Sequence, residues 1–318
     1  MASSTQHTTL LPTQYHHLLS EYHTHFDATS TTSSNITSLK VTHETQCRKL
    51  QSSRQIDAAT EVLNAADTSA TVVRVNGRFA VKVGLQVPLI EAETMKFLAA
   101  NSKVRIPKVY DAFVDPESNK TYIIMDHVPG DTLRDLLPSL GRDEKARICE
   151  LIKNKLTKLR SIPAPDYLGM IDHSPYLDGV FWNCGLDPKI CGPFASEEEL
   201  NCGMIEKLRQ TESEQYIRLL RTMMDRTLHG HRTLFTHGDL QPKNIMVERL
   251  DDGDGAPDFK ITLIDWESAG WYPEYWDFCN ATVACRFKRD WLELVPDILD
   301  EYPLEFLMMQ VVYSSVYY

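Results

Sequence analysis

Two short apolar runs, each ending in polar residues, constrain this chain more than any other feature. Residues 234–235 (Leu-Phe) are followed by residues 237–244, which read H-G-D-L-Q-P-K-N. Twenty-one residues after Asn244, Asp265 ends a second apolar run at residues 261–264. Short apolar runs of this kind are typical of buried strands. The sequence therefore predicts that His237 and Asp239 follow one strand and that Asp265 ends another.

These residue types, in this order, suit phosphoryl transfer. A carboxylate such as Asp239 can accept the proton of an attacking hydroxyl group. An amide oxygen and a second carboxylate, here Asn244 and Asp265, are the hard oxygen ligands that hold Mg²⁺ on nucleotide phosphates. A lone H-x-D sequence is usually structural, but the downstream asparagine and aspartate argue against that interpretation.

The motif resembles the aminoglycoside phosphotransferase family of small-molecule kinases, in particular its fungal-type members. The similarity continues through residues 264–277, which read I-D-W-E-S-A-G-W-Y-P-E-Y-W-D, and extends over roughly residues 70–305. The resemblance implies an α+β fold with two lobes, as in protein kinases: an antiparallel-sheet N-lobe with one main helix, and a mostly helical C-lobe. It also implies a kinase that uses ATP and Mg²⁺ to phosphorylate a hydroxyl group of a small molecule.

By this resemblance, Asp239 is the catalytic base that orients the substrate hydroxyl. His237 is expected to brace the loop by a hydrogen bond near the Asp265 segment, and Gly238 to permit an unusual backbone angle. Asn244 and Asp265 are expected to bind Mg²⁺.

The D-F-G sequence of protein kinases is replaced here by Asp265-Trp266-Glu267. Two interpretations of Glu267 stay open: a second contact to metal or substrate, or a solvated side chain. The aromatic residues Trp271, Tyr275 and Trp276 could line a substrate site, although packing is the favoured interpretation. Asp277 is expected to anchor the C-lobe.

The pattern of residues 71–125 predicts hairpin, helix, hairpin, the order of a kinase N-lobe. An Asn-Gly dipeptide between residues 72–75 and 79–83 is a strong hairpin signal. A helix follows Pro88, and two more strands are expected at residues 109–114 and 121–125.

Nucleotide-binding residues follow from the same resemblance. Lys82, in A-V-K-V, is similar to the V-A-I-K lysine that holds the α- and β-phosphates. Glu91 and Glu93 compete as its partner, but they lie about 200° apart on a helix, and the family pattern E-A-x-x-M-x-F-L favours Glu91. Adenine is expected to contact backbone groups of Asp126 and Val128.

The chain is expected to divide into three parts. Residues 1–60 form a polar extension that is partly helical, at residues 10–26, or loosely ordered. Residues 61–126 form the nucleotide-binding N-lobe, and residues 127–318 form the catalytic and substrate-binding C-lobe. Within the C-lobe, capping boxes start helices near Thr132 and Ser196, and long helices are predicted at residues 142–160 and 206–229.

Composition narrows the possible partners. A net charge of −11 disfavours nucleic acid as a partner. Seven scattered cysteines without a C-x-x-C pair indicate reduced thiols. No signal peptide or apolar run of membrane-spanning length is visible, so a cytoplasmic location is expected. The expected partner is a small-molecule hydroxyl substrate, without membrane or obligate protein partner.

Two other functions compete with an active kinase. A catalytically inactive pseudokinase could bind a nucleotide or a protein, and the missing G-x-G-x-x-G before residue 72 weakens the argument for a glycine-rich phosphate cover. A metal hydrolase could use His237, Asp239 and Asp265. The intact set of Lys82, Asp239, Asn244 and Asp265 favours an active kinase over both.

Overall fold

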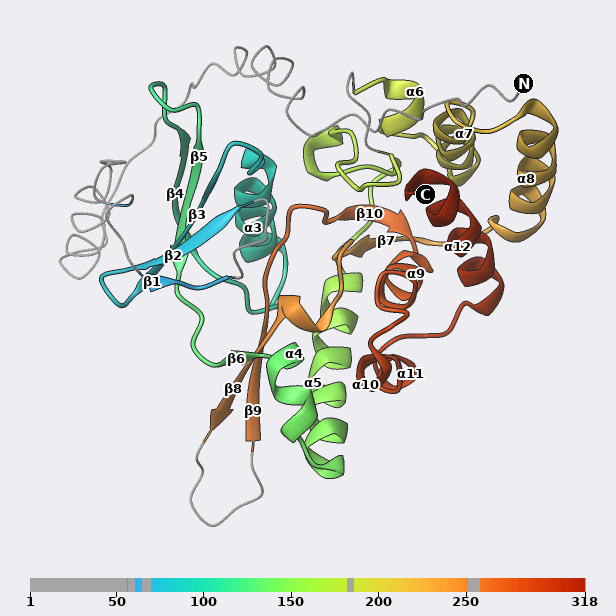
Figure 1. The fold of residues 1–318 in the computed structure, drawn as a ribbon. Helices are drawn as coiled ribbons and strands as arrows, with labels where there is room; N and C mark the ends of the chain where they lie inside the picture. The colour runs from blue at the N-terminus through green and yellow to red at the C-terminus, as the bar shows by residue number, and fades with distance from the viewer. Residues whose placement is uncertain (1–55, 57–60, 65–69, 182–185, 251–257, 318) are drawn as a thin grey trace, which may run out of the picture.

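The computed structural model of the protein describes residue 56 and residues 61–64, 70–181, 186–250 and 258–317. The helix considered at residues 10–26 lies outside the described residues. Figure 1 shows two lobes, one built on a sheet with a single long helix against it and one built mainly of helices. The predicted fold class is therefore confirmed.

The N-lobe sheet is antiparallel throughout and has the strand order β1-β2-β3-β5-β4. Its strands are β1 (Glu61–Val62), β2 (Thr71–Val75), β3 (Phe79–Gly84), β4 (Val109–Val114) and β5 (Thr121–Asp126). Asn76 and Gly77 join β2 to β3 with φ angles of 52° and 67°. Positive φ at both central positions suits the right-handed twist of a tight hairpin, as the sequence predicted.

Helix α3 (Leu89–Asn101) packs against both lobes. It begins directly after Pro88, and the Ser102 hydroxyl ends it by donating to the carbonyl of Leu98 at 2.8 Å. The ring of Phe97 stacks on Phe235 at 5.7 Å and meets the edge of Trp271 at 6.3 Å, and both partners belong to the C-lobe. The helix is therefore packed between the sheet and the C-lobe.

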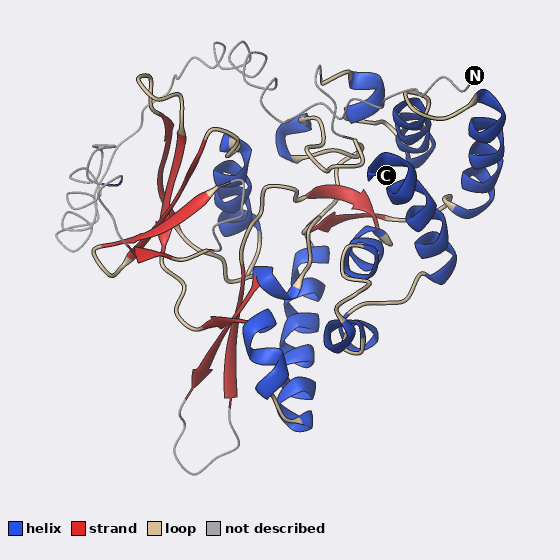
Figure 2. Cartoon of the chain, in the orientation of Figure 1, coloured by secondary structure: helices blue, strands red, loops and turns tan. Residues whose placement is uncertain are grey.

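The C-lobe combines helices with two small sheets (Figure 2). Its helices are α4 (Leu133–Leu136), α5 (Arg142–Arg160), α6 (Pro188–Cys191), α7 (Glu197–Leu208), α8 (Glu214–Thr227), α9 (Trp276–Val283), α10 (Arg289–Leu292), α11 (Val295–Ile298) and α12 (Pro303–Tyr317), with short 3₁₀ turns η3 (Leu137–Ser139), η4 (Ile171–His173) and η5 (Pro242–Asn244). One sheet has the order β6-β8-β9 and contains β6 (Asp131–Thr132), β8 (Ile245–Leu250) and β9 (Asp258–Leu263). The other pairs β7 (Thr233–Thr236) with β10 (Gly270–Pro273). None of the described helices has the length and apolar character needed to cross a membrane.

The predicted helix at residues 206–229 is wrong, because the chain breaks there. Helix α7 already ends at Leu208, and α8 starts at Glu214. The break is produced by Ser213, whose hydroxyl caps the new helix by accepting the backbone N–H of Tyr216 at 3.3 Å. Apolar residues continue at helical spacing on both sides of the break, so periodicity alone did not reveal it.

The connection between the lobes runs through Gly130. Its φ is +96°, and a Cβ atom there would lie 2.3 Å from the carbonyl oxygen of Val247 in β8. Only glycine combines this backbone angle with so close an approach of two chain segments. Immediately after it, β6 pairs with β8 through Asp131 and Val247.

We predict that Gly130→Ala lowers the free energy of unfolding by at least about 3 kcal/mol, because left-handed strain adds to a backbone clash. Gly77→Ala is the matched control: its φ is also positive, at 67°, but no heavy atom lies within 4 Å of the added Cβ. The control should cost only about 1 kcal/mol. Urea denaturation measures both, and equal losses would contradict the argument.

Candidate active site

The loop between β7 and η5 is braced by His237. The backbone N–H of Asp239 donates to Nδ1 of the ring at 3.3 Å, which leaves the ring proton on Nε2. Nε2 then donates to the carbonyl of Ile264 at 3.0 Å. The side chain is fully buried, so the histidine ties this loop to the end of β9, the position expected from the sequence.

Helix α9 holds the same loop from the other side. The Asp277 carboxylate accepts the N–H of Gly238 at 3.2 Å, and Asn280 donates to the carbonyl of Gly238 at 2.5 Å. Gly238 has a φ of +80°, and a Cβ there would lie 2.2 Å from the carbonyl oxygen of Ser268. The expected unusual angle at Gly238 is therefore present, and Asp277 anchors the loop.

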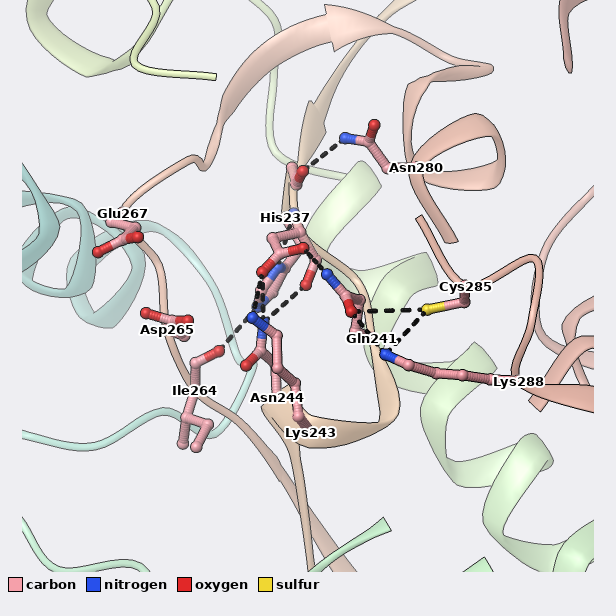
Figure 3. Close-up of polar contacts among 12 residues, drawn as sticks. His237, Gln241, Lys243, Asn244, Ile264, Asp265, Glu267, Asn280, Cys285 and Lys288 are labelled. Atoms are coloured by element: carbon pink, nitrogen blue, oxygen red, sulfur yellow. Dashed lines mark hydrogen bonds and ion pairs between the residues drawn. The ribbon is translucent and has the colours of Figure 1, made fainter. Parts of the chain in front are cut away.

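Three side chains, which are labelled in Figure 3, hold the carboxylate of Asp239: Gln241, Lys243 and Asn244. Its Oδ1 accepts a hydrogen bond from Gln241. Its Oδ2 accepts from Asn244 Nδ2 at 2.9 Å and from Lys243 Nζ at 3.2 Å. Burial works against the charge of Lys243, but Asp239, Asp265 and Glu267 together outweigh it, so the pKa of Lys243 is raised. Sequence reasoning missed Gln241 and Lys243, although both lie inside the motif.

Asn244 and Asp265 are neighbours in space. The N–H of Ile264 donates to the carbonyl of Asn244 at 3.0 Å, which places Asp265 one residue beyond this contact. The amide nitrogen of Asn244 also donates to the carbonyl of Asp239 at 2.8 Å. Because the nitrogen is used in this way, the amide oxygen of Asn244 is the atom that could bind a metal. Asp265 has a φ of 68°, a strained angle for a non-glycine residue that is often found at functional sites.

Lys82 is the centre of a cluster of buried charges. Its ammonium contacts Glu91 at 2.7 Å, Asp265 at 2.7 Å and Glu267 at 2.8 Å. The predicted contact between Lys82 and Glu91 is thus present, whereas Glu93 pairs with Lys96 on the exposed face of α3. Glu267 is not simply solvated, because it takes part in this cluster.

The pKa values of this cluster reflect the competition between burial and charge. Burial disfavours the ammonium of Lys82, yet its three carboxylate partners raise its pKa. Burial also opposes the charge on Asp265, but Lys82 holds its pKa below the usual value. Burial raises the pKa of Glu91, and Lys82 opposes the rise.

The cluster has the chemistry of a cation site. The carboxylate oxygens of Glu91, Asp265 and Glu267 lie within 4.8 Å of one another. One ammonium group faces three acids, so an excess of negative charge remains. Together with the amide oxygen of Asn244, the donors are all oxygen, which fits Mg²⁺.

The strand that ends at Asp126 leads into the connection between the lobes. The N–H of Asp126 donates to the carbonyl of Lys108 at 3.0 Å, and its carboxylate accepts from the Tyr110 hydroxyl at 2.7 Å. The N–H of Asp126 is therefore already used. Within the described part of the chain, no backbone hydrogen bond is found for Val128.

A cavity of about 370 Å³ opens beside Asp239. It is lined in part by Asp178, Gly179, Gln241, Tyr313 and Tyr317. Burial raises the pKa of Asp178 to about 6, although the N–H of Val180 and the indole of Trp276 donate to it. Sequence reasoning missed this cavity, because its walls come from distant segments that carry no motif.

The aromatic residues near the end of the motif do not line this cavity. Trp271, Tyr275 and Trp276 are all buried, and the Trp276 ring stacks on Tyr272 and Phe181 at 4.9 and 5.5 Å. The packing interpretation is confirmed for these residues.

The two-lobed architecture is a protein-kinase-like fold. The sequence matches the phosphotransferase enzyme family (APH) over residues 62–306, and the protein belongs to this family. Comparison with curated protein sequences gives no match.

Solved structures support the same fold. Aminoglycoside phosphotransferase APH(4)-Ia is 13% identical, with a TM-score of 0.54, over 85% of this chain and 88% of that one. The GDP and kanamycin complex of APH(2″)-IIIa is 14% identical, with a TM-score of 0.50, over 88% of this chain and 91% of that one. A thermostable mutant of APH(4)-Ia in a ternary complex with ADP and hygromycin B is 15% identical, with a TM-score of 0.52, over 83% and 89% of the two chains.

We predict that Glu91→Ala lowers kcat/KM for ATP at least about tenfold, because Lys82 loses the partner that orients it. Glu93→Ala removes only an exposed pair with Lys96 and should change kcat/KM less than about twofold. Steady-state kinetics of the two variants make the comparison. A larger loss in Glu93→Ala would overturn the assignment of the partner.

Proposed function

We propose that the protein transfers the γ-phosphate of ATP to a hydroxyl group of a small molecule. The observation that carries this proposal is that two clusters of side chains, one around Lys82 and one around Asp239, lie next to each other. Lys82 and Glu91 come from the N-lobe and meet Asp265, and Asp239 with Asn244 comes from the catalytic loop. The backbone bond between Ile264 and Asn244 joins the two clusters.

Nucleotide binding would use the N-lobe. Lys82 would contact the α- and β-phosphates, while Glu91 keeps the ammonium aimed at them. Adenine would contact backbone groups of Asp126 and Val128. The relatives determined with GDP, ADP or AMP-PNP support binding of a nucleotide in this fold.

Asn244, through its amide oxygen, and Asp265 would hold Mg²⁺. Glu267 would take part through its carboxylate, once Lys82 turns toward the phosphates. A bound magnesium ion offsets the negative charge of the phosphates that are being separated. The surplus of acid around Lys82 supports this assignment.

Asp239 would orient the acceptor hydroxyl and accept its proton. The acceptor oxygen forms a bond to the γ-phosphorus, the bond from that phosphorus to the β-phosphate oxygen breaks, and ADP leaves. Hydrogen bonds from Gln241, Lys243 and Asn244 keep the carboxylate in place. Most of the rate enhancement would come from positioning and electrostatics.

The acceptor would occupy the cavity beside Asp239. Relatives bound to kanamycin or hygromycin B support a small-molecule acceptor. A metal hydrolase is disfavoured, because both ring nitrogens of His237 already make hydrogen bonds and cannot bind a metal. A pseudokinase is disfavoured by the complete set of Lys82, Asp239, Asn244 and Asp265.

We expect Mg²⁺ and ATP together to raise the melting temperature of the protein. Binding to the folded state adds RT ln(1 + [L]/Kd), or about 2.7 kcal/mol at a hundredfold excess of ligand. Differential scanning fluorimetry with ATP, GTP and each metal alone provides the controls. If no combination of nucleotide and metal shifts the transition, the proposed cleft is wrong.

We also expect Asp239→Asn and Asp265→Asn to differ. Asp239→Asn keeps the side-chain shape but removes the proton acceptor, so kcat should fall at least about a hundredfold with little change in nucleotide affinity. Asp265→Asn should also weaken binding of Mg²⁺–ATP. Titration calorimetry with turnover assays separates the two, and identical behaviour would refute the division of roles.

A further inference from the structure

Lys288 lies outside every motif, yet it is connected to the proposed base. Its ammonium donates to Oε1 of Gln241 at 3.0 Å. The amide nitrogen of the same Gln241 donates to Oδ1 of Asp239. Figure 3 shows Lys288 arriving beside Gln241 from the segment between α9 and α10.

Lys288, Gln241 and Asp239 form a row of hydrogen bonds, and the chemistry of the two end residues sets the direction of each bond. A lysine ammonium can only donate hydrogen bonds, and an ionised carboxylate can only accept them. Gln241 lies between them, so its oxygen must face Lys288 and its nitrogen must face Asp239. Both ends therefore select the same orientation of the amide, in which its nitrogen is presented to the base.

The backbone fixes the position of Lys288. Its N–H donates to the carbonyl of Cys285 at 2.8 Å, and its carbonyl accepts from Trp291 and Leu292, each at 3.1 Å, at the start of α10. The Cys285 thiol lies 3.6 Å from both Lys288 Nζ and Gln241 Oε1. Burial raises the pKa of Cys285, so the neutral thiol can act as a second donor to Gln241.

We propose that Lys288 and Gln241 are positioning residues for the phosphoryl-transfer step. Asp239 is held at Oδ2 by Asn244 and Lys243 and at Oδ1 by Gln241, so the plane of the carboxylate depends on donors to both oxygens. Without Lys288, the oxygen of Gln241 loses its charged donor, so the amide that donates to Asp239 is held less firmly. This inference rests on the proposed role of Asp239 as the base.

The test compares variants of Lys288, first in the wild-type protein and then in a protein that lacks the side chain of Gln241. Lys288→Met should lower kcat for ATP hydrolysis, with Mg²⁺ present and water as acceptor, about tenfold or more, while KM for ATP changes less than about twofold. Lys288→Arg, which keeps a donor, should recover most of the loss. Arg289→Met is the matched control, because Arg289 is the next residue and its side chain is 91% exposed; it should have no effect.

The decisive comparison is made in a Gln241→Ala background. If Lys288 acts through Gln241, then Lys288→Met should produce no further loss of kcat in that background. If Lys288 had only a structural role, Lys288→Met would lower kcat by the same factor with or without Gln241, and it would lower the melting temperature equally in both backgrounds. That additive result, or an unchanged kcat in Lys288→Met alone, would overturn the proposal.

A second measurement does not depend on turnover. In ¹⁵N-labelled protein, the side-chain amide signal of Gln241, assigned by its loss in Gln241→Ala, should exchange slowly with water. It should lose this protection in Lys288→Met and keep it in Lys288→Arg. An unchanged signal in Lys288→Met overturns the inference. If the wild-type protein hydrolyses no ATP, the proposed function fails separately, and the amide signal still decides whether Lys288 orients Gln241.

Discussion

The structure depends on one buried cation. Lys82 lies in the middle of a sheet strand and is 6% exposed, a position at which an unpaired charge would be strongly destabilising. Glu91 on α3 and the pair Asp265 and Glu267 after β9 compensate it. The sheet, the long helix and the segment proposed to bind metal are thus oriented around a single ammonium group, and the same group would meet the phosphates of a nucleotide.

Neutral and acidic side chains hold the loop that carries Asp239 in place. His237 joins it to the end of β9, and Asp277 and Asn280 join it to α9. Gly238 allows the loop to approach Ser268 more closely than any side chain would permit. Asp239 therefore projects from a segment that is held on two sides, which is the arrangement expected when positioning supplies much of the rate.

Local sequence signals identified most of the fold and the central residues. The Asn-Gly hairpin and the helix after Pro88 were predictable, because each depends on neighbouring residues. The partner of Lys82 was predicted from the resemblance to a family pattern, because helix geometry left Glu91 and Glu93 as alternatives. The break at Ser213 was hidden by continuous apolar spacing. Gln241 and Lys288 could not be paired in advance, because their contact joins segments whose approach is determined only by tertiary packing. The same holds for the cavity beside Asp178.

Helix α3 has a consequence for how the cleft can move. Its buried residues, including Ala92, Met95 and Leu98, share one apolar core with the C-lobe, while much of the sheet packs in a separate core around Val81 and Ile124. Ile123 of β5 belongs to the same core as α3, so α3 packs against both lobes, and a movement of one lobe relative to the other would disturb one of these two contacts. The ion pair between Lys82 and Glu91 joins β3 of the sheet to α3, so it would oppose a movement that separates the sheet from this helix.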